Sequence, residues 1–246
     1  MKVVSKFRNV FSNWLNLNRD VLSGFKRYDL PLLISYSRSG TNLVSYIIAT
    51  ISSKEVLDGF TKDPNNQIYI VDRAHNGAKR VKHYSKIILL LRNYKECIVR
   101  HHGIERINEF QSIKSFLQDK KRQTSLWYAN NVISFHKFKG PKIVLYYEDL
   151  ILQPARSIHK LSTFLDLDMN ESKKFIENID DHYSISLNKY TQKGHKSFTK
   201  NFNQAIGIHE SKLKDQDKEA FDIFFKNVCG EEVYRQYLIR YETKSF

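Results

Sequence analysis

The sequence predicts an α/β fold, in which a single domain holds a central parallel sheet flanked by helices. Four short apolar runs have the length and composition of buried parallel strands. Stretches with helical periodicity lie between them, so that strand and helix alternate along the chain. With only 4 prolines and 9 glycines in 246 residues, no evident linker divides the chain. We therefore predict one domain over residues 1–246.

A short polar loop joins the first predicted strand, residues 30–34, to the first predicted helix. After Gly40 the apolar side chains recur with the period of one helix face, at Val44, Ile47, Ile48 and Ile51. A helix start presents unpaired N–H groups and the positive end of the helix dipole, and Gly40 allows a ligand to approach closely. Because Arg38 adds a cation, the loop is predicted to bind a phosphate or sulfate. The alternative is an ordinary turn in which Ser39 or Thr41 caps the helix.

The remaining elements continue the alternation. Strands are predicted at residues 67–71, 86–91 and 142–147. Helices are predicted at 94–102, 112–136 and 155–165, followed by an amphipathic helix with apolar residues from 221 to 241. Residues 1–28 are predicted as an amphipathic helical segment that packs on the domain rather than on a membrane, and residues 203–246 as a C-terminal helical region.

Cationic or titratable groups follow each of the first three predicted strands. Arg38 follows the first, Arg73 and His75 the second, and Arg92 the third. Ligands of open parallel sheets bind beyond the carboxyl ends of the strands. We therefore expect these four side chains to converge on one anionic ligand.

The composition points to an anionic partner. A formal net charge of +14 and a pI near 9.6 suit nucleic acid, an anionic surface or a polyanionic small molecule. The basic residues are scattered along the chain, which favours a charged pocket over a nucleic-acid-binding tail.

Two cysteines, Cys97 and Cys229, are too few for a disulfide framework and indicate a reducing, cytoplasmic compartment. We expect no signal peptide or membrane span, while peripheral membrane contact and the oligomeric state stay open.

Four motifs in order resemble the sulfotransferases that use 3′-phosphoadenosine 5′-phosphosulfate (PAPS). Residues 37–42, Ser-Arg-Ser-Gly-Thr-Asn, look like the 5′-phosphosulfate loop of that family. Residues 91–99 are similar to its 3′-phosphate segment, and residues 147–154 to its Tyr-Glu-Asp-Leu strand end with the following helix start. Residues 192–194, Gln-Lys-Gly, resemble a late Arg-Lys-Gly element. The matches span roughly residues 30–202, and their common order makes the set far more specific than any one motif.

The resemblance implies a P-loop-like fold and transfer of a sulfuryl group from PAPS to a hydroxyl or amine, which leaves 3′-phosphoadenosine 5′-phosphate (PAP). It implies no metal, in keeping with the absence of metal-ligand spacing in the sequence. The donor would be bound by Arg38, Ser39, Gly40, Thr41, Asn42, Arg92, Arg100, Tyr147, Lys193 and Gly194. Arg100 stands where the family has a serine, so it either pairs with phosphate or faces solvent. Gln192 stands where the late element has arginine.

Two side chains are predicted to act in catalysis. Arg38 stays charged, so its role would be to stabilise charge at the bridging oxygen. His75 is the candidate general base, because its ordinary pKa lies near neutrality and residues 72–75, Asp-Arg-Ala-His, loosely resemble the Lys-Thr-His stretch of the family. Asp72 either orients His75 or is the base itself. Glu148 and Asp149 are interpreted as turn and helix-capping residues rather than an acid–base pair.

Two other functions compete with this hypothesis. A P-loop kinase or NTPase needs G-x-x-x-x-G-K-[ST], and here the first glycine and the lysine are missing. A non-catalytic binder of RNA or another polyanion would explain the charge but not the ordered strand-end motifs. The acceptor is predicted to be a small molecule, with a saccharide preferred, and no nucleic-acid partner is expected.

Overall fold

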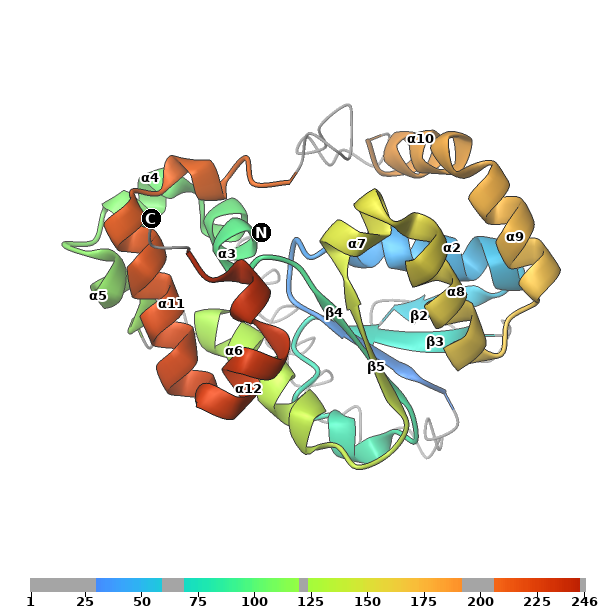
Figure 1. Ribbon diagram of the computed structural model, residues 1–246, viewed down its shortest axis with the longest axis horizontal. Coiled ribbons are helices and arrows are strands. Elements are labelled where there is room, and N and C mark those ends of the chain that lie inside the picture. Colours follow the sequence, from blue (N-terminus) through green and yellow to red (C-terminus); the bar gives the residue numbers. More distant parts are fainter. Residues whose placement is uncertain (1–29, 59–68, 120–123, 192–205, 244–246) are drawn as a thin grey trace, which may run out of the picture.

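A five-stranded parallel sheet forms the centre of the computed structural model, which describes residues 30–58, 69–119, 124–191 and 206–243 (Figure 1). The strands are β1 (Leu32–Ser35), β2 (Glu55–Asp58), β3 (Tyr69–Ala74), β4 (Ile87–Leu91) and β5 (Lys142–Tyr146). Their order across the sheet is β2-β3-β1-β4-β5, and every neighbouring pair is parallel. The predicted fold class is confirmed.

Helices cover both faces of the sheet, because successive side chains of a strand point to opposite sides. Leu32 and Ile34 of β1 pack into one core and Leu33 into the other. The first core lies under α3 (Tyr94–His102), α6 (Thr124–Lys137), α11 (Asp215–Cys229) and α12 (Glu231–Tyr237). The second lies under α2 (Thr41–Ser52), α8 (Pro154–Leu165) and α9 (Met169–Glu177), on the opposite side of the sheet in Figure 1.

The other elements are short helices and turns at the ends of these layers. They are α4 (Ile104–Asn108), α5 (Ile113–Leu117), α7 (Tyr147–Leu152), α10 (Ile179–Thr191) and the 3₁₀ turns η2 (Val81–His83), η4 (Glu210–Lys212) and η5 (Ile239–Tyr241). No helix in the described part of the chain combines the length and apolar character needed to cross a bilayer.

Two sequence predictions need correction, and some elements were missed. The helix predicted over residues 112–136 is two helices, since α5 ends at Leu117 and α6 begins at Thr124. The helix predicted from 221 to 241 is interrupted at Gly230, whose φ of 82° ends α11 before α12 begins. The edge strand β2 and the helices α9 and α10 were not predicted. The predicted segment 1–28 lies outside the described residues.

Candidate active site

The carboxyl ends of β1 and β4 form the point of the sheet where the chain diverges. From β1 the chain crosses through α2 toward the β2 edge, whereas from β4 it continues to β5 at the opposite edge. Adjacent strands whose connections leave in opposite directions open a crevice that typically binds ligands in such sheets. The polar loop after β1 and Arg92 after β4 both lie at this point.

The loop between β1 and α2 has an unusual backbone. Arg38 has a φ of 71° and Gly40 a φ of 95°, both in the left-handed region, and the N–H of Ser39 donates to the Tyr36 carbonyl at 3.1 Å. A Cβ on Gly40 would lie 2.4 Å from Cδ2 of Tyr147, so glycine is required by space as well as by conformation. Gly40 is the N-cap of α2, and among the described residues no side chain caps this helix and no acid lies in its first turn. The N-terminus of α2 therefore keeps the electrostatic character of an anion site.

Arg38 and Arg92 differ sharply in exposure. Arg38 is exposed at the loop, whereas Arg92 is only 1% exposed. The Arg92 guanidinium donates to the Arg38 carbonyl at 3.3 Å, forms a 3.3 Å ion pair with Glu96, and lies 4.3 Å from the ring centroid of Tyr147. Arg92 thus stabilises the loop by binding its main chain, whereas the side chain of Arg38 is exposed to solvent.

Arg100 lies beside these two arginines. Burial lowers the pKa of the half-buried Arg100, and the positive charges of Arg92 and Arg38 lower it further. Burial, followed by the charge of Arg38, also lowers the pKa of His101, whose ring packs against Tyr36. The positive charges of Arg38, Arg92 and Arg100 repel one another, so a bound anion would stabilise this cluster.

The polar side chains of the loop have partners within the protein. The Thr41 hydroxyl lies 2.7 Å from that of Ser35, and the buried Ser39 hydroxyl lies 3.5 Å from the Cys97 sulfur. Asn42 accepts a hydrogen bond from Arg73 at 2.8 Å. Burial raises the pKa of the Cys97 thiol to about 12, so this cysteine is a packing residue beneath the loop.

His75 lies at the end of β3, next to β1. Its ring is exposed, and its Nδ1 lies 3.2 Å from the Ser35 hydroxyl. Asp72 is fully buried and accepts hydrogen bonds from Arg80 and Tyr84, each at 2.6 Å. Both bonds end on Oδ2 of Asp72, which forms a structural ion pair with Arg80, while the ring of His75 is exposed near the loop.

Asn131 of α6 is a residue that the sequence did not single out. Its buried amide donates to the carbonyls of Ser35 and His75 at 3.1 and 3.0 Å and accepts from the N–H of Gly77 at 3.1 Å. The reverse amide orientation would place its oxygen against two carbonyl oxygens, so the pattern fixes the assignment. Asn131 joins the ends of β1 and β3 where the strands part, and its position 96 residues from Ser35 left no local signal.

Glu148 and Asp149 hold other segments in place. Glu148 accepts hydrogen bonds from the Asn93 N–H at 3.0 Å and from the Tyr241 hydroxyl at 2.7 Å. Asp149 pairs with Arg240 through two hydrogen bonds of 2.6 and 3.0 Å. Tyr241 and Arg240 lie in the C-terminal region and Asn93 at the start of α3, so in place of the capping role expected from the sequence these acids connect distant segments.

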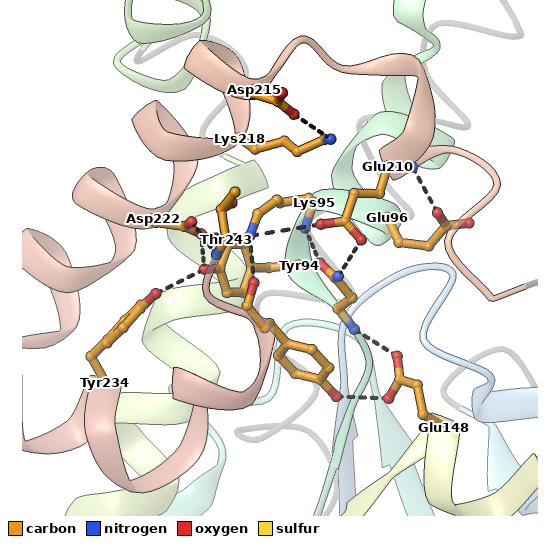
Figure 2. Close-up of polar contacts among 12 residues, drawn as sticks. Tyr94, Lys95, Glu96, Glu148, Glu210, Asp215, Lys218, Asp222, Tyr234 and Thr243 are labelled. Atoms are coloured by element: carbon orange, nitrogen blue, oxygen red, sulfur yellow. Dashed lines mark hydrogen bonds and ion pairs between the residues drawn. The ribbon is translucent and has the colours of Figure 1, made fainter. Parts of the chain in front are cut away.

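A buried charge network joins α3 to the C-terminal region (Figure 2). Lys95 forms a 2.6 Å ion pair with Asp222 and donates to the Tyr241 carbonyl, and the Tyr94 hydroxyl donates to Asp222. Glu96 accepts from the N–H groups of residues 209 and 210 at 2.7 and 2.8 Å while it holds Arg92. The charges that follow β4 are therefore bound by residues more than a hundred positions away.

The late motif cannot be placed, because Lys193 and Gly194 lie outside the described residues. The structure describes the chain again from residue 206, and Glu96 of α3 accepts hydrogen bonds from the N–H groups of His209 and Glu210. Burial lowers the pKa of the half-buried His209, as do Arg100 and Arg92, while the carboxylate of Glu96 opposes the shift. His209 is a second residue near the arginine cluster that sequence reasoning missed.

In the described part of the chain, no group of three metal-ligating side chains lies together.

Comparisons with known proteins agree with the geometry. A sequence profile described as the sulfotransferase domain matches residues 29–236. The crystal structure of the mouse sulfotransferase SULT7A1 complexed with PAP resembles this structure with a TM-score of 0.60. That match covers 92% of each chain at 18% sequence identity, and at such identity it establishes the fold. No curated protein sequence matches significantly.

Proposed function

We propose that this chain, which belongs to the sulfotransferase domain family, transfers a sulfuryl group from PAPS to a hydroxyl or amine. Membership agrees with the resemblance found in its motifs. The observation that carries the proposal is the loop of residues 35–41, which opens an uncapped helix where β1 and β4 diverge and has the exposed Arg38 at its turn. A donor with about four negative charges also accounts for the basic composition.

The loop supplies groups of the kind that such a donor needs. The first turn of α2 supplies N–H groups for the 5′-phosphate, with Ser39, Gly40, Thr41 and Asn42 forming the turn. Arg100 reaches the 3′-phosphate more readily than Arg92, because Arg100 is half-buried and Arg92 is buried beneath the loop. Arg92 and Tyr147 support the loop through contacts with Arg38 and Gly40. Lys193 and Gly194 complete the donor site in our proposal.

Arg38 and His75 carry the chemistry in this proposal. The donor supplies a sulfuryl group joined through oxygen to a phosphate that can leave. His75 Nε2 takes the proton of the acceptor hydroxyl as the acceptor oxygen forms its bond to sulfur. The bond between sulfur and the bridging oxygen breaks, and Arg38 stabilises the negative charge that this oxygen keeps in PAP. Asp72 is the weaker candidate for the base, since it is fully buried and its Oδ2 accepts hydrogen bonds from Arg80 and Tyr84.

Ligand-induced thermal stabilisation tests the donor. PAP should raise the Tm more than ATP with Mg²⁺ or a short RNA at equal concentration, because a ligand stabilises by about 2.7 kcal/mol at a hundred times its Kd. Greater stabilisation by ATP with Mg²⁺ would favour an NTPase, and greater stabilisation by RNA would favour a polyanion binder. Either result contradicts the proposed donor.

Transfer of labelled sulfur from PAPS tests the reaction and its base. His75→Ala should lower kcat by about 10²- to 10⁴-fold, the usual contribution of a general base. His159→Ala is a matched control, because His159 is an exposed histidine of α8. An unchanged rate in His75→Ala would move the role to Asp72 or another group.

The acceptor and the compartment complete the proposal. We propose a small polar acceptor, such as a saccharide, since no sequence feature indicates a long apolar site. Both cysteines of the chain are free and buried, which suits a reducing compartment such as the cytoplasm. A screen of sugars, phenols and amines with labelled PAPS identifies the acceptor class directly, and turnover of phenols alone would contradict the saccharide preference.

A further inference from the structure

Two hydroxyl groups connect the anion loop to the proposed base. The Thr41 hydroxyl at the start of α2 lies 2.7 Å from the Ser35 hydroxyl, and the Ser35 hydroxyl lies 3.2 Å from Nδ1 of His75. Ser35 is fully buried and Thr41 is 4% exposed, so water does not readily replace the contact between these two hydroxyls. Ser35 has no role of its own in the proposed donor site or catalytic pair, yet it contacts Thr41 of the one and His75 of the other.

The number of protons shared by Thr41, Ser35 and His75 limits the ways in which their hydrogen bonds can be directed. Each hydroxyl has one proton to donate, and a neutral histidine carries a proton on only one ring nitrogen. If Ser35 donates to Nδ1, the histidine proton lies on Nε2, and Nε2 cannot act as a base. If Ser35 donates to Thr41, the Ser35 oxygen accepts a proton from Nδ1–H, and Nε2 keeps its lone pair.

We propose that Ser35 is a positioning residue that, together with Thr41, holds His75 in the tautomer whose Nε2 accepts a proton. The inference rests on the proposed function, in which His75 is the base. An oxyanion bound at the α2 N-terminus accepts the Thr41 proton, so Thr41 becomes an acceptor for Ser35 and Ser35 for Nδ1–H. Binding of the donor thereby selects the reactive tautomer of His75 before the acceptor arrives.

Asn131 holds the main chain of Ser35 and that of His75 close together. Its amide binds the main-chain carbonyls of both Ser35 and His75 and the N–H of Gly77. The main chain of both residues is fixed by a helix that packs on β1 and β4. The side-chain contact between Ser35 and His75 therefore does not depend on the exposed histidine ring alone.

Nitrogen-15 NMR of the full-length chain measures the tautomer without any turnover. The spectra are recorded above the pH at which the ring is seen to titrate, where the imidazole is neutral, and His75→Gln identifies its signals. We expect the proton on Nδ1 in the wild type, with a larger excess of that tautomer when PAP is added. Thr41→Val keeps the shape but removes the acceptor, so Ser35 then donates to Nδ1 and the proton moves to Nε2.

Ser35→Ala removes the contact and should shift the population away from the Nδ1–H tautomer, with kcat about tenfold lower, a change of about 1.4 kcal/mol. Ser162→Ala is the control, because Ser162 forms a comparable buried hydroxyl pair with Ser172 on α8 and α9. It should leave both the tautomer and the rate unchanged.

Two results overturn the inference: a wild type with its proton on Nε2, or the same tautomer population in the wild type, Ser35→Ala and Thr41→Val. These readouts need no transfer activity, and the comparison of ligand-free variants needs no PAP binding. Failure of the proposed function is a separate result, seen as the absence of both PAP stabilisation and labelled transfer.

Discussion

Arg38 and Arg92 follow adjacent strands of one sheet, yet the structure uses them in opposite ways. The backbone around Arg38 is formed by neighbouring residues: a turn, a glycine and the first turn of a helix. Arg92 belongs to a buried network that draws on α7, α11 and the C-terminal turns. The comparison teaches that a cation after a strand is a candidate ligand only if tertiary contacts leave it exposed.

The two regions also solve different electrostatic problems. Around α3, buried Lys95 and Glu96 each have carboxylate, carbonyl or N–H partners that offset the cost of removing charge from water (Figure 2). At the loop, exposed Arg38 lies near Arg100, and the charges of both have the same sign. We expect the first region to contribute to stability and propose that the second contributes to binding, and the following substitutions test this division.

The largest expected effect is on stability in the buried network. Lys95→Met should lower the free energy of unfolding by about 3–5 kcal/mol, because it leaves Asp222 as a buried carboxylate without its cation. For a chain of this size the Tm should fall by roughly 6–20 °C. Calorimetry measures the change, and Lys114→Met on the exposed face of α5 is the matched control. A fall no larger than in Lys114→Met would show that the network is not structural.

Arg38→Ala should reverse that pattern and affect catalysis instead of stability. We expect kcat to fall by about 10²- to 10³-fold, since one fixed donor of charge stabilisation is lost, with a change in stability within about 0.5 kcal/mol. Initial rates with labelled PAPS and a melting curve measure both quantities. Arg106→Ala, which removes an exposed arginine of α4, controls for net charge. Unimpaired turnover in Arg38→Ala would remove Arg38 from the mechanism.

Gly40→Ala tests whether the shape of the loop depends on the ring of Tyr147. The added Cβ would lie 2.4 Å from that ring, and alanine would have to keep the backbone φ of 95°. We therefore expect the free energy of unfolding to fall by about 1–3 kcal/mol and PAP to bind more weakly. Gly230→Ala has a similar φ of 82° with open space around it, and it isolates the backbone strain. Chemical denaturation compares the two variants. Equal losses would mean that contact with Tyr147 does not shape the loop.

The smallest expected effect concerns the ion pair between Asp149 and Arg240. Both side chains are more than a third exposed, so Asp149→Asn should cost less than about 1 kcal/mol, and the loss should shrink in high salt. Urea denaturation at two salt concentrations measures it. Glu148→Gln, at a buried neighbour that binds Asn93 and Tyr241, should cost more. The opposite ranking would contradict the assignment of buried charges to stability.

Much of the fold could be predicted because its signals are local. The apolar runs of β1, β3, β4 and β5 and the helical periods of α2, α3 and α8 were all predicted to within a few residues. The strand β2 was missed because four residues carry too weak a pattern, and it pairs only with β3 at the sheet edge. The split of the last helix at Gly230 depended on a backbone conformation that composition does not reveal.

The sequence by itself determined four of the five strands, the glycine turn into α2 and the order of motifs that indicated the family, because each depends on neighbouring residues. Only the tertiary structure decided that Arg92 is buried beneath the loop, that Asp72 is paired with Arg80, and that Asn131 joins the strand ends. Exposure and pairing depend on segments far apart in the chain, and these contacts form only when the helices pack onto the sheet.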